Sequence, residues 1–215
     1  MKVLQCWDDG VVSDIRLIEI LKKYNATATF NLCIGKNGRD REVVGQFEEV
    51  DIVSLKRSEL YDLYKDFDVA NHSLTHPFLS SLSYEEVHHE VAQNKAQLEA
   101  VFHREIKGFC YPFGSVNSLV KDVVKETGHQ YARTVDSLQP SENNEDNLML
   151  KTSCHFLDPK FWTIYTASKE KGIFYFWGHS FEIKTEEMWV DFEDKIRRIA
   201  NDKQSVWGSI QQEYK

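Results

Sequence analysis

Apolar and polar segments alternate along the chain in a way that predicts strands interleaved with helices. Short apolar runs are separated by longer segments whose apolar residues recur at helical spacing. The predicted strands are 3–8, 26–32, 68–70, 106–111, 130–135, 148–152, 173–177 and 206–210. The predicted helices are 16–24, 58–65, 84–103, 119–127, 159–171 and 186–202, and the polar stretches 35–45 and 140–147 are predicted to be loops. This order favours a parallel sheet or barrel with both faces of each strand buried.

Composition narrows the class of protein. The chain has 215 residues, 41% of them hydrophobic and 13% aromatic, which predicts one globular domain over residues 1–215. A net charge of -8 argues against a nucleic-acid or anionic-membrane partner, and no apolar run is long enough to span a bilayer. Four well-separated cysteines are expected to be reduced core residues. The chain shows no signal peptide, so we expect a cytoplasmic protein, or an extracytoplasmic one whose leader was trimmed.

Polar residues follow several predicted strands directly. Asp8 and Asp9 end the first strand, His72 and His76 follow the strand at 68–70, and His179 follows the most apolar strand. In a β/α barrel the loops after the strands build the active site. These residues are therefore expected at one rim.

The residue types at that rim match the needs of a metal-dependent hydrolase. His72 and His76 are four residues apart, on an expected turn because a proline follows them, and with Asp9 they could bind zinc while leaving room for water and substrate. Asp8 would then be a general base and His179 a general acid. The alternatives are a chance histidine pair, a solvated carboxylate and a core histidine.

The same residues lie in motifs that resemble those of the polysaccharide deacetylases (NodB-homology domain, carbohydrate esterase family 4). The four matching segments occur in the family's order over nearly the whole chain. They are Cys6-Trp7-Asp8-Asp9-Gly10, Asn71-His72-Ser73-Leu74-Thr75-His76, Phe109-Cys110-Tyr111-Pro112-Phe113-Gly114 and Trp177-Gly178-His179-Ser180. The first two are specific in combination.

The resemblance implies a distorted (β/α)7 barrel that hydrolyses acetyl groups from amino sugars. It implies Asp9, His72 and His76 as ligands of Zn²⁺, or of another divalent metal such as Co²⁺, Ni²⁺ or Mn²⁺. It also implies Asp8 as the base and His179 as the acid. The backbone N–H of Phe113 would help to stabilise the oxyanion.

Two departures from the family motifs affect residues that support the catalytic groups. Cys110 stands where the motif usually has an arginine that holds the base, and Arg133 at the end of a later strand is the candidate substitute. The acid-and-tryptophan motif that orients the catalytic histidine is not visible, and Asp136 is the candidate to orient His179.

The expected partner is a carbohydrate substrate. Among the aromatic residues near these loops, Tyr111 and Phe181 are expected to line the substrate pocket, although core positions are the alternative. Other functions compatible with the same residues are hydrolysis of O-acetyl sugars or of another C–N amide, or a carbohydrate-binding barrel without turnover. The sequence sets no oligomeric state.

Overall fold

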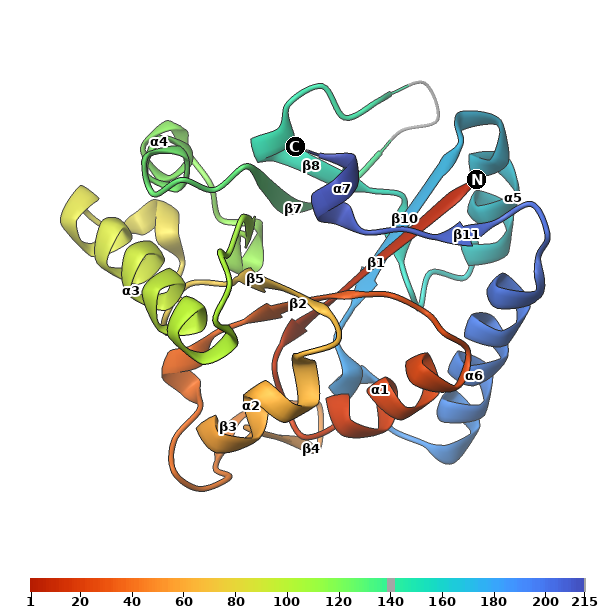
Figure 1. The fold of residues 1–215 in the computed structure, drawn as a ribbon, viewed down its shortest axis with the longest axis horizontal. Helices are drawn as coiled ribbons and strands as arrows, with labels where there is room; N and C mark the ends of the chain where they lie inside the picture. Colours follow the sequence, from red (N-terminus) through yellow and green to blue (C-terminus); the bar gives the residue numbers. More distant parts are fainter. Residues whose placement is uncertain (139–141, 215) are drawn as a thin grey trace.

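The strands form one parallel, nearly closed barrel surrounded by helices (Figure 1). The structure, a computed structural model, describes residues 1–138 and 142–214. The strands of the barrel are β1 (Lys2–Asp9), β2 (Thr29–Leu32), β5 (Asp68–Asn71), β6 (Gly108–Cys110), β7 (Tyr131–Ser137), β8 (Leu150–Thr152), β9 (Cys154–His155) and β10 (Ile173–Gly178). Their order is β8-β7-β6-β5-β2-β1-β10-β9, and β11 (Val206–Trp207) pairs with β1. The distorted (β/α)7 barrel predicted from the sequence is confirmed.

The barrel closes through a single short segment of chain. β8 pairs with β7 and β9 pairs with β10, and only Ser153 separates β8 from β9. The backbone N–H of Ser153 donates to the carbonyl of Tyr175 at 2.6 Å, and its hydroxyl accepts from the N–H of Tyr175 at 3.0 Å. Residues 150–155 therefore form the seam between the two ends of the sheet.

Helices cover the outer face of the barrel (Figure 1). They are α1 (Asp14–Lys23), α2 (Arg57–Tyr64), α3 (Tyr84–Phe102), α4 (Ser118–Glu126), α5 (Phe161–Lys171) and α6 (Glu186–Asn201). The predicted helices are confirmed to within a few residues at their ends. Their apolar faces pack on outward-facing strand residues such as Trp7, Phe30 and Phe176. Within the described residues, no helix is long and apolar enough to cross a membrane.

Side-chain alternation along the strands gives the barrel an apolar interior beneath a polar upper layer. Leu4, Tyr131 and Tyr175 belong to one buried cluster together with Ile210 of the short helix α7 (Ile210–Glu213). Tyr131 packs so closely on β6 that a Cβ added at Gly108 would lie 2.3 Å from its ring. Asp8 lies on the same face of β1 as Leu4, nearer the carboxyl end of the strand. The packed apolar interior therefore lies directly beneath the polar residues at that end of the barrel.

Some local predictions need correction. The predicted loop 35–45 runs into a two-stranded antiparallel hairpin, β3 (Val43–Phe47) and β4 (Val50–Val53), because its last residues pair with a second short strand. The predicted strand 206–210 ends at Trp207, and Ile210 begins α7. Part of the predicted loop 140–147 lies outside the described residues. All four cysteines are buried and free, as predicted.

Candidate active site

Asp8 lies at the end of β1 with its carboxylate pointing into the barrel. Asn31, its register partner on β2, donates an N–H to Oδ1 at 2.7 Å, and the guanidinium of Arg133 donates to Oδ2. Burial alone would raise the pKa of Asp8, but the charge of Arg133, two nearby histidines and the Asn31 hydrogen bond hold it well below its usual value. Asp8 is therefore a carboxylate at neutral pH.

Arg133 reaches Asp8 from β7, the strand that pairs with β6, on which Cys110 lies. Cys110 on β6 and Arg133 on β7 are register partners, so both side chains enter the same layer of the barrel. The guanidinium lies 2.7 Å from the Cys110 sulfur and 4.5 Å from the centre of the Trp177 ring. The structure thus places Arg133 on Asp8, the predicted base, as the predicted substitute for the motif arginine.

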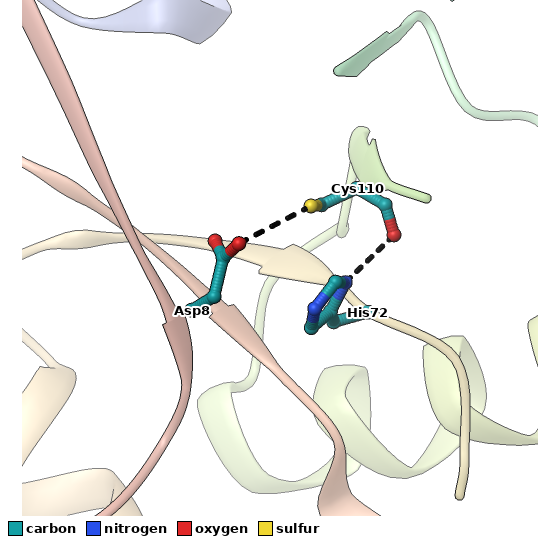
Figure 2. A group of neighbouring side chains, drawn as sticks. All are labelled: Asp8, His72 and Cys110. Carbon is teal, nitrogen blue, oxygen red and sulfur yellow. Dashed lines mark hydrogen bonds between the residues drawn. The ribbon is translucent and has the colours of Figure 1, made fainter. Parts of the chain in front are cut away.

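Cys110 also helps to orient the first histidine (Figure 2). Its thiol faces Asp8 at 3.8 Å, and its carbonyl oxygen lies 2.8 Å from Nδ1 of His72. Because a carbonyl only accepts, Nδ1 of His72 carries the proton and Nε2 keeps a free lone pair. That nitrogen faces Asp9, 4.0 Å from Oδ1.

One carboxylate oxygen of Asp9 faces an imidazole nitrogen of His72 and one of His76. Nε2 of His76 lies 3.7 Å from the same Oδ1 of Asp9, which is buried and has no hydrogen-bond partner among the described residues. Burial lowers the pKa of both histidines, and with the added effect of His72 the pKa of His76 falls to about 3. Neutral imidazoles and an unpartnered carboxylate oxygen are what a divalent metal requires, so these residues fit one.

Cys33 is a poorer ligand although it lies close to this group. Its sulfur is near Asp9 and His72, but its S–H donates to the carbonyl of His72 at 2.9 Å. Burial raises the pKa of this thiol well above its usual value. The thiol is therefore already engaged as a hydrogen-bond donor, whereas Oδ1 of Asp9, which both histidines face, has no hydrogen-bond partner among the described residues.

The backbone around the site is strained and held by hydrogen bonds. Asp9, Ser73, His76 and Phe113 have φ angles of 82°, 61°, 65° and 56°, a region that residues other than glycine seldom adopt. The loop after β5 is a turn, as predicted from the proline after His76. Asn71 Oδ1 accepts from the N–H of Ser73 at 2.9 Å, and the hydroxyl of Ser73 accepts from the N–H of His76 at 3.0 Å.

His179 lies on the other side of Asp8, with Nε2 3.9 Å from Oδ2 of that carboxylate. Its Nδ1 faces Glu182, 3.4 Å from Oε2, and Glu182 also lies 2.9 Å from Nε2 of His155. Burial lowers the pKa of His179, but Glu182 and the aspartates raise it further, so the net change is upward. Asp136, the residue predicted to orient His179, is exposed at the end of β7, and it is Glu182 that faces Nδ1 of His179.

Sequence reasoning missed Glu182, His155 and Asn31. Glu182 is three residues after His179, in the short turn Ser180–Glu182, so the spacing was a usable signal. His155 comes from β9 and Asn31 from β2, and both meet the site only through strand pairing. No local pattern marks either residue.

The two predicted pocket aromatics lie in different surroundings. Tyr111 is fully buried among core residues and donates its hydroxyl to the carbonyl of Leu148 at 2.9 Å, so it presents no surface to a substrate. Phe181 is half-buried, with its ring centre 4.8 Å from that of His179. Phe113 sits in the turn Pro112–Gly114, and its ring lies 4.4 Å from that of His76.

Comparison with known proteins gives one family match and several similar structures. The family described as polysaccharide deacetylase matches residues 1–132. A family 4 carbohydrate esterase from Streptomyces lividans, solved with acetate, is 18% identical with a TM-score of 0.61, over 98% of this chain and 94% of that one. A CE4-family pseudoenzyme from Bacillus anthracis is 18% identical with a TM-score of 0.62, over 98% of this chain and 64% of that one.

A deacetylase from Streptococcus pyogenes, solved with acetate, is 20% identical with a TM-score of 0.53 over 62% of this chain. The chain spans 56% of the length of that deacetylase and 64% of the length of the pseudoenzyme. At these identities the likeness concerns the fold. No curated protein matches the chain in sequence.

Proposed function

The chain belongs to the polysaccharide deacetylase family, and from this premise we propose that it is a metal-dependent hydrolase that removes acetyl groups from N-acetylated amino sugars of an oligo- or polysaccharide. One observation carries the proposal. Asp8, held as a carboxylate by Arg133, lies between the ligand set of Asp9 with two histidines and the imidazole of His179. A base, a metal site and an acid around one point are the parts that amide hydrolysis requires.

Asp9, His72 and His76 would hold the metal. When bound, a divalent metal such as zinc supplies a Lewis acid for the acetyl carbonyl and lowers the pKa of water. The proton on His72 Nδ1, fixed by the carbonyl of Cys110, keeps Nε2 available as a ligand. The left-handed backbone at Asp9 and His76 accompanies a geometry in which both histidines face Oδ1 of Asp9.

Asp8 would accept a proton from the attacking water. Its Oδ1 is bonded to Asn31 and its Oδ2 to Arg133, so the carboxylate cannot rotate. Arg133 thus has two effects in the proposal, because it keeps Asp8 ionised and fixes its orientation. It would be a positioning residue, since it acts through Asp8.

His179 would donate a proton to the leaving nitrogen of the sugar. The pKa of this imidazole is raised above its usual value, so the protonated form persists closer to neutral pH. Glu182 accepts from the backbone N–H of His179 at 3.0 Å and faces its Nδ1 at 3.4 Å, and through these contacts it would orient the ring with Nε2 toward Asp8. The backbone N–H of Phe113 would donate to the developing oxyanion.

The test is acetate release from N-acetylglucosamine oligomers. Protein stripped by a chelator is assayed before and after zinc is added back, with Asp8→Asn as the variant and metal content measured on both proteins. Release that returns with zinc and is lost in Asp8→Asn with its zinc retained would support the proposal. Zinc binding without release of acetate by the wild type would contradict it and favour a different acyl substrate or a barrel that only binds carbohydrate.

A further inference from the structure

Two phenylalanine rings lie exposed beside the metal-ligand candidate His76. Phe78 is 58% exposed and Phe113 is 52% exposed, and their ring centres are 4.1 Å apart with the planes 13° from parallel. The rings come from separate loops, one after β5 and one after β6. Together they make a stacked aromatic surface, which we call the Phe78–Phe113 pair.

Folding alone does not account for this pair. Large apolar side chains lower the free energy of folding when they are buried, and both rings remain about half in water. The left-handed backbone of Phe113 directs its N–H, and the oxyanion role proposed above uses only that N–H. Neither that role nor core packing explains why an apolar ring stands here with a second ring stacked on it.

The position of the pair connects it to the reacting centre. The rings of Phe113 and His76 pack in a T-shaped arrangement, with their centres 4.4 Å apart and their planes at 72°. On the His179 side of the site, the rings of Phe181 and Phe47 pack on each other with their centres 5.6 Å apart, and both residues are half-buried. Around the described part of the site, the open aromatic surface therefore lies on the His76 side.

We propose that the Phe78–Phe113 pair is a sugar-binding subsite for the unit next to the one that loses its acetyl group. A pyranose ring has a face of C–H groups with its hydroxyls at the rim, and a flat aromatic surface matches that face without needing a charged partner. The substrate is then a chain of at least two linked amino sugars that extends from the reacting unit toward the His76 side. This inference rests on the proposed function.

The experiment compares a long and a short substrate. Phe78→Ala and Phe78→Trp are assayed as zinc-loaded proteins on the N-acetylglucosamine tetramer and on the monomer. The matched control is Tyr61→Ala, which removes an aromatic ring that is 44% exposed on α2 and packs on Phe102. Phe113 is left unchanged because its backbone belongs to the proposed catalytic machinery.

We expect Phe78→Ala to raise KM for the tetramer by roughly three- to tenfold while kcat, and kcat/KM for the monomer, stay unchanged. Phe78→Trp should keep the preference for the tetramer, and Tyr61→Ala should resemble the wild type. The subsite would be overturned if Phe78→Ala left the ratio of kcat/KM for the tetramer to kcat/KM for the monomer unchanged. It would also be overturned if Tyr61→Ala raised KM for the tetramer as much as Phe78→Ala does.

Calorimetric binding of the tetramer separates this proposal from the proposed function. The measurement uses zinc-loaded Asp8→Asn with and without Phe78→Ala, so it does not depend on turnover. Weaker binding with Phe78→Ala supports the subsite even if no protein releases acetate, which would be a failure of the proposed function alone. Equal binding, or no binding to either protein, overturns the subsite even where acetate is released.

Discussion

The buried ion pair between Asp8 and Arg133 gives the sharpest test of the site. Only 3% and 2% of their side-chain surfaces are exposed. Arg133→Met would leave the Asp8 carboxylate with Asn31 as its hydrogen-bond donor and the thiol of Cys110 nearby. Breaking a buried pair by removing one partner costs about 3–5 kcal/mol, because the remaining charge stays buried without compensation.

Protonation of Asp8 limits that cost. With a pKa of about 3.9 in the unfolded chain and about 1.4 kcal/mol per pKa unit, protonating this group at pH 7 costs about 4 kcal/mol. We therefore expect Arg133→Met to lower the free energy of unfolding at pH 7 by about 3–4 kcal/mol.

The pH dependence follows from the direction of the pKa shift. In the wild type the folded pKa of Asp8 is lowered, so its contribution to stability is complete above the unfolded pKa and is lost as the pH falls through the folded pKa. The variant instead has a buried carboxyl that must take up a proton at neutral pH. The stability difference between the two proteins should be largest near pH 7 and shrink as the pH falls toward about 4.

The register of β6 and β7 supplies the matched variant. Because Cys110 and Arg133 are partners across the two strands, Cys110→Arg with Arg133→Cys returns a guanidinium to the same layer from the neighbouring strand. Urea unfolding at pH 4 and pH 7, with acetate release and zinc content, is measured on the single and double variants. The double variant should regain part of both stability and turnover. A loss below about 1 kcal/mol in Arg133→Met, typical of exposed pairs, would refute the reasoning.

Two further predictions concern the acid and the barrel interior. Glu182→Gln removes the charge that raises the pKa of His179. The alkaline limb of the pH profile of kcat should therefore move to lower pH, while the zinc content stays unchanged. An alkaline limb that does not move would reject the role of Glu182. Gly108→Ala would place a Cβ 2.3 Å from the Tyr131 ring and should destabilise the fold by about 1–3 kcal/mol in denaturant unfolding. Gly38→Ala, where the nearest atom would be 3.8 Å away, is the control, and an equal effect would contradict the packing argument.

The sequence predicted the parts of the site that follow directly from strand ends. Asp8 and Asp9 end an apolar run, and the place of Arg133 at the end of a later strand made it the candidate partner of Asp8, to which the structure shows it donating. Tyr111 was misplaced because Cys110 points into the barrel, so the next side chain must point outward into the helix layer. Asp136 lies beyond Thr134 on β7, where the residues leave the buried interior and are exposed, a change of burial that the strand pattern did not show.

The hairpin β3–β4 and the pairing of His155 with Glu182 escaped prediction for a common reason. The hairpin is short and mostly polar, so it has little of the apolar alternation that marks a strand. His155 lies on a two-residue strand whose location depends on how the barrel closes. Both features are set by long-range contacts rather than by local sequence.

The seam at residues 150–155 has a consequence for native-state fluctuations. The segment joins β7, which carries Arg133, to β10, which leads to His179, through strands of three and two residues. Sub-global opening events concentrate where few hydrogen bonds must break, so amide hydrogen exchange in β8 and β9 should be faster than in the longer strands β7 and β10 beside them. Each opening would separate Arg133 from the carboxylate of Asp8 without unfolding the helices around the barrel. The lifetime of the working geometry would then be set by the closure of the barrel rather than by the stability of the whole molecule.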